Sequence, residues 1–195
     1  MAVRIRSHFH RRAGERGMPE LASVIAALSW NLSQNAIRNM RKADFDINIG
    51  RPYFDFMCEY LAFVLHVTDR IVYRMLDADR RVAFTTALAR RLAEIVEDNR
   101  DMLIAETTPG DCQRHFIALV NERAGDYAEF GYDEKEGPDF AFRRFFASRL
   151  LEIVPEKDHP WVYDQAMEIE AHDAVEALQR TLDGLFSPLA NTPDR

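Results

Sequence analysis

The chain has 195 residues, of which 47% are hydrophobic and 29% are charged, and its formal net charge is −7. This length suits one domain with at most a small appendage, and it can bury about 70% of the unfolded surface without a structural disulfide or metal. No apolar run approaches the ~20 residues of a membrane span, and the basic N-terminus lacks the apolar core of a secretory signal. These features favour a cytoplasmic protein whose two cysteines, Cys58 and Cys112, pack as small hydrophobic groups.

The charge is unevenly distributed along the chain. Residues 1–17 hold five arginines and one glutamate, so the remainder is acidic. An acidic body repels phosphate, which disfavours general affinity for nucleic acid or anionic lipid. The first 17 residues contain a single aromatic residue, Phe9, and no helix-turn-helix pattern follows them. We interpret residues 1–17 as a basic N-terminal arm, and nucleic-acid contact through this arm is the least favoured of three functional hypotheses.

The composition favours helices over strands, because glycine and proline number only 8 each and alanine, leucine, arginine and glutamate are frequent. No strand-like alternation of useful length and no internal repeat occurs. The sequence therefore predicts an all-α protein, an antiparallel bundle of about six helices around a central apolar helix at residues 53–76. We expect one helical domain over residues 18–186 and a frayed tail over residues 187–195.

The first expected helix covers residues 19–42 and begins with Pro19 in its first turn, where a missing N–H is tolerated. The second covers residues 53–76 and is apolar around most of its circumference, so other elements should surround it. The third should begin after Asp77 or Asp79, since either is a good N-cap, and should end before residue 107.

The fourth expected helix begins with the clearest local signal. Thr108 is a candidate N-cap, Pro109 fits the first helical position, and Asp111 could reach back as in a capping box. Residues 131–138 then form an acidic, turn-rich connection and the best internal hinge.

The last two helices are expected at about residues 139–153 and from residues 158–160 to about 185. Their aromatic content exceeds what two short helices need for one core, which favours a homodimer. The residues on which this argument depends are Phe140, Phe142, Phe145, Phe146 and Trp161.

Polar side chains within the central helix are the first candidates for a functional site. Glu59, His66, Asp69 and Arg70 lie among large apolar residues, and ionisable groups with perturbed environments collect at functional sites. A structural network is the favoured interpretation, because a buried polar group without a partner costs ~1–3 kcal/mol. We expect Asp69 to accept hydrogen bonds from an arginine or tyrosine, and a ligand pocket is the alternative. The candidate partners are Arg38, Arg41, Tyr60 and Tyr73.

A metal site is a weaker hypothesis. Imidazole and carboxylate groups suit iron, manganese or zinc when several helices turn them inward. On the last helix, Glu168, His172 and Glu176 are spaced by four residues, and other helices offer similar groups. The Glu-x-x-His pairs typical of dinuclear helical bundles do not occur within the expected helices. The candidate metal ligands are Glu59, His66, His115, Glu168 and His172.

The sequence contains none of the motifs that mark a catalytic nucleophile, a phosphate-binding loop or a dinucleotide-binding turn. It therefore favours a non-catalytic protein and leaves the cofactor unknown. The leading hypothesis is a protein interaction module that forms a homodimer. A bundle that binds a metal or a small ligand is the alternative.

Overall fold

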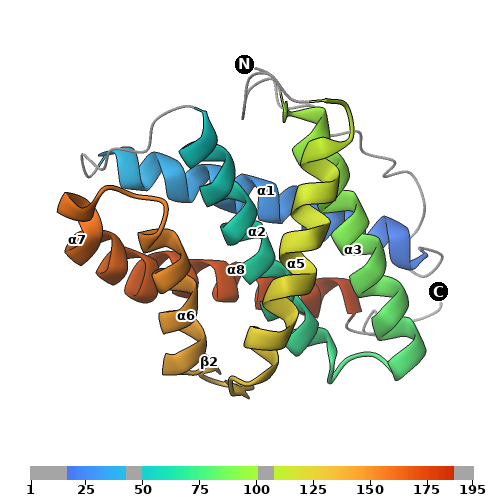
Figure 1. Ribbon diagram of the computed structural model, residues 1–195. Helices are drawn as coiled ribbons and strands as arrows, with labels where there is room; N and C mark the ends of the chain where they lie inside the picture. Colours follow the sequence, from blue (N-terminus) through green and yellow to red (C-terminus); the bar gives the residue numbers. More distant parts are fainter. Residues whose placement is uncertain (1–16, 43–49, 101–107, 187–195) are drawn as a thin grey trace, which may run out of the picture.

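The protein is described by a computed structural model over residues 17–42, 50–100 and 108–186, in which nearly all residues are helical (Figure 1). The predicted arm, except Gly17, and the whole predicted tail at residues 187–195 lie outside these residues. The helices are α1 (Met18–Lys42), α2 (Arg51–Val72), α3 (Ala78–Asp98), α5 (Asp111–Ala128), α6 (Phe140–Leu151), α7 (His159–Asp164) and α8 (Ala171–Phe186). Shorter elements are a 3-10 turn, η2 (Glu156–Asp158), a π-helix, η3 (Gln165–Glu170), and strands β1 (Tyr132–Asp133) and β2 (Gly137–Pro138).

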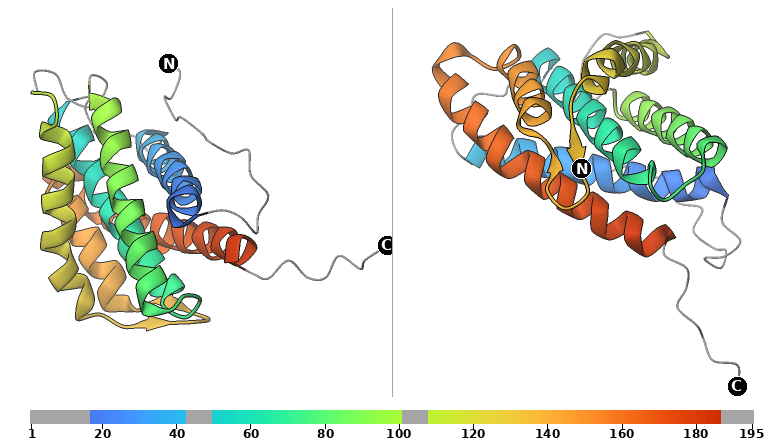
Figure 2. Two further views of the ribbon diagram at one scale, coloured as in Figure 1. Left: turned by 90° about the vertical axis from the view of Figure 1, so that its right-hand side faces the viewer. Right: turned by 90° about the horizontal axis from the view of Figure 1, so that it is seen from below.

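The helix α2 is the centre of the fold, which confirms the predicted all-α bundle around this segment. It contacts α1, α3, α5, α6 and α8, and 15 of its 22 residues are buried. Figures 1 and 2 show α1 and α8 running across α2, while α3, α5 and α6 pack along its other side. Fully burying one large apolar side chain contributes ~1.5–3 kcal/mol, so this helix contributes much of the hydrophobic stabilisation.

The helix α2 ends at Val72, four residues earlier than the predicted limit of residue 76. The amides of Met75 and Leu76 both donate to the Val72 carbonyl, which closes the helix in a tight turn. Asp77 then caps α3, as its position predicted, by accepting a hydrogen bond from the Arg80 amide at 2.9 Å.

The start of α5 differs from the sequence prediction. Gly110, with φ 86°, is the N-cap, and the helix begins at Asp111. Asp111 does accept from the Thr108 amide at 3.1 Å, so the predicted reach-back contact forms one turn outside the helix. Glu97 of α3 accepts the amides of Gly110 and Gln113 at 2.7 and 3.1 Å. It therefore satisfies the N–H of Gln113, which an N-cap side chain would otherwise bind.

The predicted connection at residues 131–138 contains a small hairpin. The strands β1 and β2 pair antiparallel, with Tyr132 opposite Pro138. Asp139 holds the base of this hairpin, because its carboxylate accepts both the Gly131 amide at 2.8 Å and the Phe142 amide at 2.7 Å. The same side chain therefore closes the connection and caps α6.

The predicted last helix is interrupted, because α7, η3 and α8 follow one another with a π-helix in the middle. The residues that face the core are spaced by four throughout this segment, whereas an α-helix repeats every 3.6 residues. A π-helical turn takes up extra residues and keeps a spacing of four on one face. The buried residues with this spacing are Val162, Ala166, Glu170, Ala174, Leu178 and Leu182.

The two cysteines are buried and are not joined by a disulfide, as the sequence predicted. Among the helices of the described residues, none combines the length and apolar character needed to cross a membrane.

Candidate functional site

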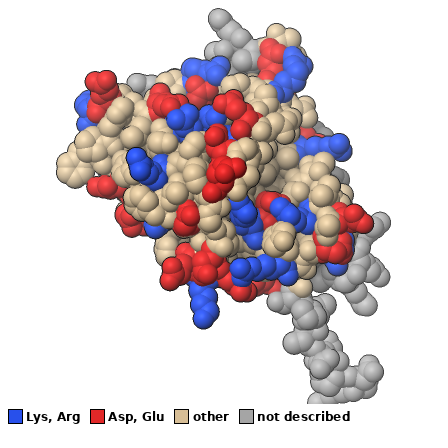
Figure 3. Space-filling model, turned by 60° about the horizontal axis from the view of Figure 1, so that its bottom comes forward, with Lys and Arg blue, Asp and Glu red and all other residues tan. Residues whose placement is uncertain are grey.

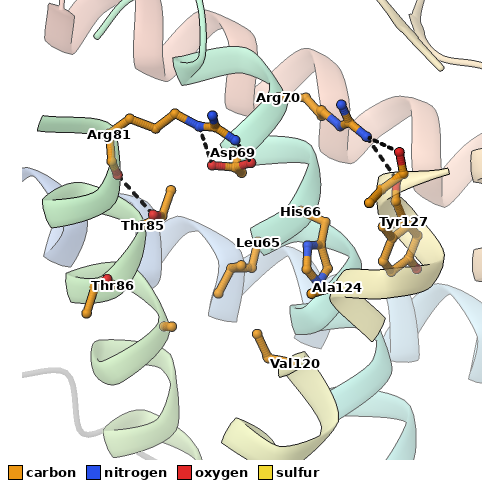
Figure 4. A pocket seen from close by; sticks show the side chains of 12 residues that line it. Leu65, His66, Asp69, Arg70, Arg81, Thr85, Thr86, Val120, Ala124 and Tyr127 are labelled. Carbon is orange, nitrogen blue, oxygen red and sulfur yellow. Dashed lines mark hydrogen bonds and ion pairs between the residues drawn. The ribbon is translucent and has the colours of Figure 1, made fainter. Parts of the chain in front are cut away.

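Three of the four predicted ligand candidates meet at a cleft between α3 and α5, with α2 as its floor (Figure 4). The cleft has a volume of about 390 Å³. It stays open because the facing positions of α3 and α5 carry small side chains. These residues are Thr85, Thr86, Ala89, Ala124 and Ala128.

Asp69 and Arg81 form an ion pair at one end of the cleft. The Arg81 Nε and Nη2 atoms donate to the two carboxylate oxygens of Asp69 at 2.8 and 2.5 Å. This bidentate geometry is the strong form of a carboxylate–guanidinium contact. The prediction that Asp69 pairs with Arg38, Arg41, Tyr60 or Tyr73 is therefore wrong. Tyr73 instead packs under the Arg81 guanidinium, whose central carbon lies 4.8 Å from the centroid of the Tyr73 ring. Arg81 belongs to α3, and its place one helix later along the chain gave no local sequence signal.

Arg70 lies on the other side of Asp69 and holds the C-terminal end of α5. Its Nη2 atom donates to the carbonyls of Tyr127, Ala128 and Phe130 at 3.0, 3.2 and 3.2 Å. Tyr127 and Ala128 are the last residues of α5 and Phe130 follows the helix, and a cation suits carbonyls at the negative end of the helix dipole. Arg70 therefore has a structural role that its sequence position did not predict.

His66 forms part of the floor and is half-buried against α5. Its ring lies 4.8 Å from the ring of Tyr127, measured between centroids. Burial lowers the pKa of His66 to about 4, against the opposing influence of the Val120 backbone and the Asp69 carboxylate. The ring is therefore uncharged at neutral pH. Its Nε2 atom is buried and has no hydrogen-bond partner within the described residues.

Glu59, the fourth candidate, lies outside the cleft in a buried ion pair with Arg123 of α5. The Arg123 Nη2 atom is 2.6 Å from the Glu59 carboxylate, and Nε is 3.1 and 3.2 Å from its two oxygens. Both residues are only 7% exposed. Arg123 also donates to the exposed carboxylate of Glu122 at 2.6 Å. Arg123 therefore neutralises the buried Glu59 carboxylate of α2 within the protein, as the structural-network interpretation expects.

The five predicted metal ligands are not brought together. Glu59 is paired with Arg123 as described, His115 packs against the ring of Phe54, and Glu168 and His172 are exposed on η3 and α8. Glu168, His172 and Glu176 do line one groove of about 560 Å³, as their spacing predicted. Across the described ranges, no three histidine, cysteine, aspartate or glutamate side chains are grouped so that they could hold a metal ion.

The aromatic residues of the last helices are divided between core and surface, so fewer of them are free to form a dimer interface than the sequence suggested. Phe142 and Phe146 are fully buried, and Phe146 stacks on Phe63 of α2 with 4.1 Å between ring centroids. Phe145 also packs against the core. The surplus therefore consists of Phe140 and Trp161, whose exposed fractions are 60% and 68%.

Glu170 is a functional candidate that the sequence analysis missed. Its carboxylate is buried at the end of the π-helix and accepts from Gln165 at 2.9 Å and from Asn39 at 3.3 Å. Both donors are neutral amides, and burial raises the pKa of Glu170. The signal that could have revealed it is the spacing of four between apolar residues on either side, which places position 170 on the core face.

Comparison with models of known families, with characterised proteins and with solved structures finds no match for this chain.

Proposed function

We propose that this protein is a cytoplasmic interaction module that forms a homodimer through the surface of α6, α7 and η3. The observation that carries the proposal is where the large apolar side chains are exposed. Within the described residues, Phe140, Trp161 and Ile169 are exposed on these three elements, which pack against one another. Exposed apolar residues gathered on one unit are typical of a protein contact, whereas single ones need no explanation.

The charges on this unit support a second copy of the same chain as the partner. The helix α6 carries arginines and no acidic residue, and η3 carries glutamates and no basic residue. A two-fold axis brings each patch of one copy onto the other patch of its partner, so α6 of one chain meets η3 of the other. Arg144 and Glu168 are the exposed side chains available for this pairing, whereas Arg143 is half-buried and lies 4.0 Å from Glu168 of its own chain. Figure 3 shows acidic and basic side chains interspersed on one face of the molecule, without a broad field of a single sign.

Sedimentation equilibrium of the full chain tests the proposal. We expect a mass twice the 22.6 kDa of one chain at micromolar concentration. Replacing both Phe140 and Trp161 by serine should yield a monomer of unchanged helical content. The matched control replaces Tyr73 and Val82 by serine, because these residues are 64% and 63% exposed but lie at the end of α2 and in α3. A monomeric wild-type chain, or equal loss of the dimer in both variants, would contradict the proposal.

A further inference from the structure

The cleft between α3 and α5 has two ends of different character. Figure 4 shows Arg81, Asp69 and Arg70 gathered at one end, with Leu65 and Val120 further along. The apolar part is completed by alanines of the two facing helices. Pockets that bind small molecules combine an apolar lining with a few polar groups that fix orientation, and their volumes begin at about 300 Å³. This cleft, at about 390 Å³, falls within that range.

The polar end carries a net positive charge and unused hydrogen-bond donors. Arg81 pairs with the one carboxylate there, Asp69, while the guanidinium of Arg70 lies beside them and is directed toward the end of α5 (Figure 4). The neighbouring His66 ring is uncharged at neutral pH. Arg81 uses Nε and Nη2 for Asp69, and Arg70 uses Nη2 for the α5 carbonyls. A guanidinium has five N–H groups, and within the described residues the Nη1 atoms of Arg70 and Arg81 have no hydrogen-bond partner. One further negative group at this end would neutralise the cleft.

The same arrangement argues against other ligand classes. A metal cation would find one carboxylate, already engaged by Arg81, and two positive charges. A wholly apolar molecule would leave the arginine donors without partners, which is unfavourable when they lose water. A polymer such as nucleic acid does not fit a space of this volume.

We propose that the cleft binds a small organic carboxylate, with its carboxylate on Arg70 and Arg81 and its short apolar chain over Leu65 and Val120. The two arginines keep their structural contacts, because the ligand takes N–H groups that those contacts leave unused. Arg–carboxylate pairing supplies orientation, and the alanines leave the room for the chain. This site lies on helices other than those of the proposed dimer surface, so it adds a binding function to the interaction module.

Nuclear magnetic resonance titration of the full chain with butyrate tests the site. We expect saturable shifts of the His66 ring and Thr86 methyl resonances, with a Kd on the order of 1 mM. Butyramide, which has the same shape without the charge, should give no saturation, and inorganic phosphate should bind more weakly because it lacks the apolar chain. Equal binding of butyramide or phosphate, or no saturation by butyrate, would overturn the proposal.

A pair of variants separates cleft binding from general effects on the fold. Ala124→Leu fills the cleft from α5 and leaves every charge in place, so it should weaken butyrate binding at least about tenfold. Ala83→Leu adds the same side chain at an exposed position of α3 that does not line the cleft, and it should bind like wild type. Phe140→Ser, in the proposed dimer surface, should also bind like wild type. Unchanged binding by a folded Ala124→Leu variant would place butyrate elsewhere and refute the site.

Discussion

The buried ion pair between Glu59 and Arg123 should contribute to stability in a strongly asymmetric way. It joins α2 to α5, and both residues are almost inaccessible to water. Glu59 receives all its described hydrogen bonds from Arg123, whereas Arg123 also donates to Glu122, whose side chain is 68% exposed. Removing Arg123 therefore leaves a buried carboxylate without a donor, but removing Glu59 leaves the guanidinium one acceptor.

This asymmetry gives different magnitudes for the two single variants. Arg123→Met should lower the free energy of unfolding by about 3–5 kcal/mol, the range for breaking a buried pair. Glu59→Met should cost about 1.5–3 kcal/mol, the range for losing hydrogen bonds to a charged group that keeps another partner. The double variant should lie within about 1 kcal/mol of wild type, because apolar side chains can replace a buried ion pair without loss.

Urea unfolding followed by circular dichroism measures all four proteins of this double-mutant cycle. Arg180→Met is the matched control, since Arg180 pairs with Glu176 on the exposed face of α8 and its loss should cost below about 1 kcal/mol. Equal costs for Arg123→Met and Glu59→Met, or additive effects in the double variant, would refute the reasoning.

Three further predictions follow from single side chains. Burial raises the pKa of Glu170, so ionisation of Glu170 destabilises the fold as pH rises above its unfolded pKa of about 4.3. In urea unfolding, Glu170→Gln should therefore be more stable than wild type at about pH 8, and the gain should be smaller at about pH 4. The ring resonances of His66 should titrate near pH 4. The contribution of the uncharged His66 ring to stability is therefore present above its unfolded pKa of about 6.5 and is lost as pH falls toward 4. A titration midpoint near 6.5 would show that the ring is solvated. Asp139→Ala should lower the free energy of unfolding by about 2 kcal/mol and Asp77→Ala by about 1 kcal/mol, because Asp139 accepts hydrogen bonds from two backbone amides and Asp77 from one. Equal melting temperatures for these two variants would argue against the second contact of Asp139.

The helices themselves could be predicted because their signals are local. The apolar surround of α2 and the cap at Asp77 both depend on residues close together in the chain. The limits of α2 and α5 were less accurate, since a tight turn at Val72 and the left-handed Gly110 decide them. Backbone turns of this kind depend on tertiary context more than on side-chain periodicity.

The partners of the polar side chains could not be predicted, because they come from other helices. The sequence singled out Asp69 and Arg70 as polar groups in an apolar helix, and both have internal partners. Neither Arg81 nor the carbonyls at the end of α5 could be identified by spacing, because Arg81 lies 12 residues from Asp69 and those carbonyls lie 57 or more residues from Arg70. Glu170 was missed for a related reason, since a regular α-helix was assumed where a π-helix changes which residues face the core.

The central claim is that the other helices enclose α2 and that its ionisable side chains pair with groups inside the protein. Hydrogen exchange of the α2 amides, measured by nuclear magnetic resonance, tests this claim most directly. We expect the amides around Phe63 to be among the slowest to exchange, with an opening free energy equal to that of global unfolding in urea. Exchange of these amides through a smaller, local opening, faster than at the middle of α8, would contradict the account.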